Sequence, residues 1–128
     1  HSRVGARRPA YCTAGGKVLL ANLPSAERER RVRSCCLEAC TPNTITDPER
    51  LLEELEKTAQ RGYALDDEEV ELGVRCVASP VLLPGGTALA AVTVSAPAFR
   101  APIERLLTFV PLLQRTVADI GRSLGLNG

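Results

Sequence analysis

The chain has 128 residues, of which 45% are hydrophobic and 24% are charged, and its formal net charge at pH 7 is +1. This composition is typical of a globular domain and excludes collagen-like, disordered and membrane-spanning chains. A charge so near zero, with only two lysines, argues against direct recognition of nucleic acid phosphates. We expect one ligand-binding domain over residues 1–128, with His1 and Ser2 as the remnant of an expression tag.

Two helices are predicted in the first third of the chain. The first begins after Thr13, whose side chain can cap it, and ends at residues 22–24, Asn-Leu-Pro. Ser25 opens the second helix, which runs from Ala26 to about Cys36 and carries many arginine and glutamate side chains. That composition predicts a largely exposed helix.

The clearest helix signal follows a turn-rich connector at residues 40–46. Asp47 is the expected N-cap, Pro48 takes the first helical position, and the helix runs to about Arg61. Gly62 stands where a left-handed C-terminal cap is needed. The apolar stripe predicted to face the core consists of Leu51, Leu52, Leu55 and Ala59.

After residue 62 the pattern changes from helical to strand-like. Residues 63–65 lead into an acidic run at 66–69, and strands over 73–83 and 87–95 are joined by a Pro-Gly-Gly hairpin. Pro97 closes the sheet, and a helix over 103–124 follows, which Pro111 must kink or split and Gly125 ends. This order predicts an α+β fold, with helices packed on one face of an antiparallel sheet.

The five cysteines, the lack of a signal peptide and the lack of an 18-residue apolar run predict a reducing, cytoplasmic setting without a membrane partner. On a helix, Cys36 and Cys40 would share a face and could present two thiolates to zinc. The cysteine spacing lacks a C-x-x-C pair, however, and His1 is the single histidine. Buried cysteines acting as small hydrophobes are favoured, and we expect no metal and no cofactor.

The second hairpin strand predicts a small pocket. Strict alternation places Ala88, Ala90, Val92 and Val94 on one face and Leu89, Ala91, Thr93 and Ser95 on the other. Small residues beside hydroxyls leave room for a ligand, and Cys76 of the neighbouring strand could join the hydroxyls across the hairpin. A solvent-exposed polar edge is the alternative interpretation.

The predicted start of the first helix offers a second wall for that pocket. Gly15 and Gly16 have no Cβ to obstruct an approaching group, and the unpaired N–H groups and the helix dipole favour a carboxylate there. The segment is not a nucleotide-binding P-loop, because Tyr11 stands at the position of its first glycine and Val18 at that of its Ser/Thr.

Four segments resemble, in order, the motifs of the C-terminal effector-binding domain of the IclR-type transcriptional regulators. They are residues 8–17, 41–47, 61–69 and 73–78. The most specific is the Gly-Tyr-x-x-Asp-Asp-Glu-Glu stretch followed by Gly-x-x-Cys-x-Ala. The resemblance implies a GAF-like fold, binding of a small metabolite, and assembly as a homodimer or tetramer. It also implies that DNA is bound only through a helix-turn-helix domain outside these residues.

By the same resemblance, the effector site falls on the backbone of residues 14 and 15 and on four side chains of the sheet. Family ligands are small carboxylates or aromatic acids, and Leu19, Val74 and Leu89 would limit their size. Asp66 cannot partner an ionised carboxylate, so we expect it to accept from a ligand hydroxyl or hydrated carbonyl, or to hold the pocket loop. The candidate site residues are Ala14, Gly15, Gly16, Leu19, Asp66, Cys76, Leu89, Ala91, Thr93 and Ser95.

The sequence departs from the family pattern at its start. Pro9-Ala10-Tyr11 stands in place of the common Pro-Leu-His, and Gly15 is an additional glycine. The helix and strands that normally open the family domain are missing, so we expect a chain truncated within the domain, with an exposed sheet edge.

Two other functional classes remain open. One is an oligomerisation module whose pocket is filled by side chains, against which the small residues at positions 14, 91 and 93 argue. The other is an enzyme built on Cys76 and the carboxylates at 66–69. Because a nucleophilic cysteine needs an adjacent base and His1 is the single histidine, we expect no enzyme.

Overall fold

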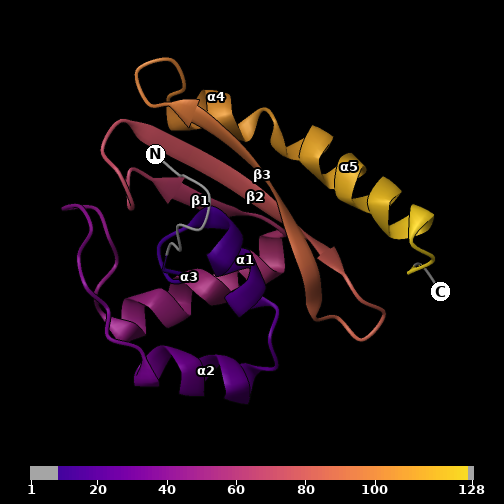
Figure 1. Cartoon of the computed structure of the whole chain (residues 1–128), viewed down its shortest axis with the longest axis horizontal. Coiled ribbons are helices and arrows are strands. Elements are labelled where there is room, and N and C mark those ends of the chain that lie inside the picture. The colour runs from indigo at the N-terminus through magenta and orange to yellow at the C-terminus, as the bar shows by residue number, and fades with distance from the viewer. Residues whose placement is uncertain (1–8, 127–128) are drawn as a thin grey trace.

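The computed structural model describes residues 9–126, which fold into a three-stranded antiparallel sheet with helices on both faces (Figure 1). The expected tag remnant, His1 and Ser2, lies outside the described residues, as does Arg8 of the first family-like motif. None of the helices formed by residues 9–126 has the length and apolar character that a membrane crossing requires.

The sheet has the order β1-β2-β3, with β1 at Ala64–Asp67, β2 at Val74–Leu82 and β3 at Ala88–Pro97. The predicted hairpin between β2 and β3 is confirmed. The first strand extends further than predicted, because the first two residues of the acidic run pair with β2. One end of the sheet therefore carries carboxylates on a regular strand.

Adjacent residues of β2 point to opposite faces of the sheet, so the core has one part on each face. Val77 packs with Val92 and Val94 against α4 (Ile103–Leu107) and α5 (Val110–Ser123). Ala78 packs on the other face against α1 (Ala14–Ala21). The prediction that helices cover one face is therefore wrong, whereas the α+β class and the alternation in β3 are confirmed.

The last predicted helix is split, as the internal proline indicates. The break falls at residues 108–109, and Pro111 takes a position in the first turn of α5, where no N–H is needed. This arrangement lets α4 and α5 lie along the same face of the sheet (Figure 1).

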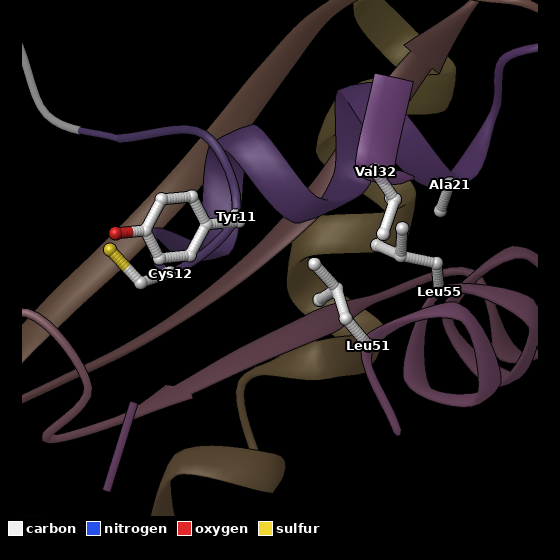
Figure 2. Packing of buried hydrophobic residues seen from close by; sticks show 6 residues of the cluster. All are labelled: Tyr11, Cys12, Ala21, Val32, Leu51 and Leu55. Atoms are coloured by element: carbon white, nitrogen blue, oxygen red, sulfur yellow. The ribbon is translucent and has the colours of Figure 1, made fainter. Parts of the chain in front are cut away.

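Of the remaining helices, α3 (Pro48–Arg61) packs on the side of α1 that faces away from the sheet, and α2 (Ser25–Ser34) packs on α3. Val32, Leu51 and Leu55 meet in the close view of this core, where Tyr11 and Cys12 enter from the start of the chain (Figure 2). α1 is thus held between α3 and the sheet, which fixes its N-terminus relative to β2 and β3.

The cap signals of α3 are confirmed. Asp47 Oδ1 accepts from the Glu49 N–H at 3.2 Å, and Gly62 adopts a left-handed φ of 83°. The predicted apolar stripe is wrong at one position, because Ala59 is exposed and Thr58 is buried instead. Thr58 lies seven residues after Leu51 on the same face, and its hydroxyl is satisfied by the Glu54 carbonyl at 2.8 Å.

The end of α2 differs from the prediction. The helix stops at Ser34, and Cys35 is already extended. Tyr11 holds the segment that follows, because its hydroxyl donates to the Glu38 carbonyl at 2.6 Å and accepts from the Glu38 N–H at 3.0 Å. Cys36 and Cys40 therefore share no helical face, and both are exposed rather than buried. Within residues 9–126, no group of three or more His, Cys, Asp or Glu residues could hold a metal ion.

Candidate functional site

A cavity of about 440 Å³ lies between the N-terminus of α1, the acidic end of β1 and the β2–β3 hairpin. This volume suits a small metabolite. The buried part of the wall comes from α1 and β1, whereas Thr93 and Ser95 on β3 are exposed. The lining residues are Thr13, Ala14, Gly15, Asp66, Val70, Glu71, Val74, Cys76, Thr93 and Ser95.

Three of the predicted site residues form a row across the sheet. In the strand register Asp66 pairs with Cys76, and Cys76 pairs with Ser95. Residues paired in this way project from the same face, and the Cys76 Sγ lies 3.1 Å from the Ser95 Oγ. The antiparallel pairing therefore brings together a carboxyl, a thiol and a hydroxyl that are up to 29 positions apart in the sequence.

Gly15 brings α1 close to this row. A Cβ added at Gly15 would lie 3.5 Å from the Thr93 Oγ1 and 3.7 Å from the Ala91 Cβ. The glycine thus leaves open space between helix and strand. Six of the ten predicted site residues line the cavity: Ala14, Gly15, Asp66, Cys76, Thr93 and Ser95.

The other four predicted residues lie outside the lining. Gly16 is turned toward Ala10 and Thr13, and Ala91 packs beside Ala14 in the core between α1 and the sheet. Leu19 and Leu89 are 42% and 52% exposed, because each lies at least one helical turn or one strand repeat beyond the cavity. Sequence alternation identified the correct face of β3 but not which part of it α1 covers.

The start of α1 presents hydrogen-bond donors at the cavity wall. Thr13 caps the helix by accepting from the Gly16 N–H at 3.0 Å, as predicted. The N–H groups of Ala14 and Gly15 precede the first backbone hydrogen bond of the helix, which the Lys17 N–H donates to the Thr13 carbonyl. Positive charge at this helix end favours an anion on the cavity side.

A buried ion pair that sequence reasoning missed ties α1 to the acidic turn. The Lys17 Nζ lies 2.5 Å from the Glu69 Oε1 and donates to the Leu65 carbonyl at 2.9 Å. The Lys17 and Glu69 side chains are only 1% and 8% exposed. One sequence signal was available, because Lys17 is the single charged residue of α1. The pair holds the two walls of the cavity in a fixed relation.

The acidic turn after β1 is itself held by its own backbone. The Asp66 Oδ1 accepts from the Glu69 N–H at 2.7 Å, and the Glu69 Oε2 accepts from the Asp67 N–H at 3.0 Å. Glu68 adopts a positive φ of 56°, an uncommon conformation for a residue with a side chain. The run of carboxylates therefore forms an ordered turn.

The connector at residues 41–44 binds this turn from outside through three side-chain hydrogen bonds, which together we call the clasp. The Thr44 hydroxyl donates to the Glu69 carbonyl at 2.5 Å, and the Thr41 hydroxyl donates to the Glu68 carbonyl at 2.6 Å. The Asn43 side chain donates to the Asp67 carbonyl at 3.0 Å. Two segments with family-like motifs are thus parts of one hydrogen-bonded unit beside the cavity.

We expect Thr44→Val to lower the free energy of unfolding by about 1–3 kcal/mol, because buried groups lose their partners. The Thr44 Oγ1 accepts from the N–H groups of Cys40 and Thr41 as well as donating to Glu69. Urea denaturation measures the change. Thr46→Val, at an exposed position of the same connector, is the control, and equal losses in both variants would contradict the clasp.

The electrostatics of the cavity centre on Asp66. Burial raises the pKa of the Asp66 carboxyl to about 6, and the Glu69 carboxylate adds to the rise, while the Glu69 N–H and the Lys17 ammonium oppose it. Glu71 contributes a second carboxyl to the lining. Among residues 9–126, no lysine, arginine or histidine lines the cavity.

Both the sequence and the fold of this chain are similar to those of known proteins. The family model described as "Bacterial transcriptional regulator IclR C-terminal" matches residues 1–122. A curated relative, the "probable transcriptional regulator SauR" of Cupriavidus necator, is 44% identical over 119 residues, which are 93% of this chain and 47% of that protein. The chain spans about half the length of the curated relatives it matches.

Solved structures agree with this match. The Thermotoga maritima IclR structure is 38% identical with a TM-score of 0.89, over 98% of this chain and 51% of that one. A double mutant of the inducer-binding domain of the PobR transcription factor from Acinetobacter, in complex with 3-hydroxybenzoic acid, is 36% identical. Its TM-score is 0.85, over 92% of this chain and 68% of that one.

Proposed function

We propose a ligand for the cavity from the premise that this chain belongs to the IclR family of bacterial transcriptional regulators, whose C-terminal domain it forms. Since its relatives are named as transcriptional regulators, the chain is a regulatory domain and not an enzyme. The ligand is a small carboxylate or an aromatic acid, and its binding is the signal to which the regulator responds.

One observation carries this proposal. Side chains and backbone from α1, β1, β2 and β3 that the sequence singled out separately converge on one cavity of about 440 Å³. An acid in this cavity would accept from the N–H groups of Ala14 and Gly15 and from the hydroxyls of Thr93 and Ser95. The inducer-binding domain of PobR, seen with an aromatic acid, has the same fold and supports this choice of ligand.

The regulatory role extends the same proposal to the longer protein. We assign residues 1–128 to one ligand-binding domain and place the protein in the cytoplasm, where it binds DNA through a helix-turn-helix domain outside these residues. The domain assembles as a homodimer or tetramer. Ligand binding then shifts the balance between subunit arrangements only by its differential affinity for them.

A thermal-shift screen tests the ligand proposal on this chain. At a hundredfold excess over Kd, an acid that binds the folded state adds about 2.7 kcal/mol of stability, which raises Tm by several degrees. The panel contains aliphatic carboxylates together with benzoate and 3-hydroxybenzoate. Thr93→Val and Ser95→Ala each remove one hydroxyl donor and are expected to weaken binding about tenfold.

Ser123→Ala, which removes an exposed hydroxyl at the end of α5, is the matched control and should bind as the unmodified chain does. A Tm that no acid raises, at any pH between 5.5 and 8.5, would overturn the proposed ligand class. An acid whose effect persists unchanged in both hydroxyl variants binds elsewhere, and that result would overturn the assignment to this cavity.

A further inference from the structure

We propose that the cavity binds its carboxylate together with one proton, which Asp66 holds and donates to the ligand. The inference rests on the proposed function, because it concerns the ligand of the same cavity. It replaces the expectation from sequence that Asp66 only accepts hydrogen bonds or holds the pocket loop.

The lining of the cavity gives the first argument. Asp66 is 4% exposed and lines the cavity, so an incoming carboxylate lies beside a buried carboxyl group. No lysine or arginine of residues 9–126 lines the cavity. Two ionised carboxylates in a buried site repel each other, whereas a protonated and an ionised carboxyl share a hydrogen bond.

The groups that face Asp66 give the second argument. The positive charge of Lys17 on α1 lowers the pKa of Asp66. The Lys17 ammonium is already paired with Glu69, at 2.5 Å. The other groups on this side are Glu71 in the turn, Cys76 across the strand pair, and Cys12 before α1, whose own thiol is affected by the charge of Asp66. None of these is cationic, so the donors at the start of α1 can bind the ligand carboxylate, but no side-chain charge on this side offsets a second anion at Asp66.

The proton is available at a small cost. Burial holds the pKa of Asp66 at about 6 in the free chain, so about a tenth of the carboxyls are protonated at pH 7. An anionic ligand alongside raises this pKa further. Between the free and the bound pKa, binding takes up one proton, and affinity is expected to fall about tenfold for each pH unit above pH 6.

Isothermal titration calorimetry tests the inference with benzoate and 3-hydroxybenzoate between pH 5.5 and 8.5. Titrations in phosphate and in Tris buffer, which differ in ionisation enthalpy, give the number of protons taken up. Near pH 7.5 the expected uptake approaches one proton per ligand. Benzamide, which has no charge, should show neither proton uptake nor a dependence of affinity on pH.

Asp66→Asn supplies a donor that does not titrate, while its side-chain oxygen can still accept from the Glu69 N–H. We expect this variant to bind the acid without proton uptake and, at pH 8, about tenfold or more tightly than the unmodified chain. Glu71→Gln is the matched control, because it also removes one carboxylate from the lining but should leave the proton uptake unchanged.

A direct titration makes the test independent of how the variant folds. The carbon-13 shift of the Asp66 carboxyl should report a pKa near 6 in the free chain and a higher one in the complex. Acid binding without proton uptake, or an Asp66 pKa that does not rise in the complex, would overturn the inference and leave the proposed function standing. A panel in which no acid binds at any pH would overturn both.

Discussion

Lys17→Met is expected to lower the free energy of unfolding by about 3–5 kcal/mol at pH 7, because it leaves Glu69 as a buried charge without its partner. Glu69 is 6% exposed, so little water can reach its carboxylate. Methionine fills a volume close to that of lysine, which limits the contribution from lost packing. Urea denaturation followed by circular dichroism measures the change.

A double variant separates charge from packing. If removing the Glu69 charge as well recovers none of the lost stability, then packing, not the unpaired carboxylate, determines the effect.

A second variant and a surface pair complete the comparison. Lys17→Met combined with Glu69→Gln removes both charges, and we expect it to recover part of the lost stability. The Arg33 Nη1 and the Glu49 Oε1 lie 2.7 Å apart, but their side chains are 46% and 65% exposed. Glu49→Gln is therefore expected to leave the denaturation midpoint nearly unchanged, since water screens this pair.

Elements specified by neighbouring residues could be predicted from the sequence. The helix from Pro48 to Arg61 was correct at both ends, because an Asp-Pro start and a glycine with positive φ act within one turn of the chain. The face of β3 was correct for the same reason, since alternation along a strand is a local property.

Features that depend on contacts distant in sequence were missed. The end of α2 is set by Tyr11 bonding to Glu38, 27 residues away. The Lys17–Glu69 pair joins residues 52 apart, and nothing around either one indicates the other. The second covered face of the sheet was missed, although the apolar residues on both sides of β2 fit a strand that is buried on both faces.

For the candidate site as well, motif residues could be predicted from the sequence, whereas residues placed by distant contacts could not. The resemblance to the family motifs identified Asp66, Cys76 and Ser95, and the strand register brings them into one row. Val70 and Glu71 were not identified, because they enter the lining through the shape of the acidic turn. That shape depends on the clasp from residues 41–44, which no local pattern at 66–71 indicates.

The two adjacent glycines of α1 are expected to respond in opposite ways to the same substitution. A Cβ at Gly16 would lie 2.4 Å from the Ala10 carbonyl oxygen, 2.5 Å from the Ala10 Cα and 2.6 Å from the Thr13 Oγ1. Because two of these atoms are backbone and the third is the helix cap, the chain before α1 must move. We expect Gly16→Ala to lower the free energy of unfolding by about 3–4 kcal/mol.

Gly15→Ala is the matched control, since its Cβ meets the Thr93 Oγ1 and the Ala91 Cβ only at ordinary contact distances of 3.5 and 3.7 Å. Alanine favours the helix over glycine, so the stability of this variant should stay within about 1 kcal/mol of the unmodified chain or exceed it. Its methyl group nevertheless enters the cavity wall and should weaken acid binding. Urea denaturation and calorimetry on both variants separate the roles. A stable Gly16→Ala, or a Gly15→Ala that unfolds, would contradict the way α1 packs against the start of the chain and β3.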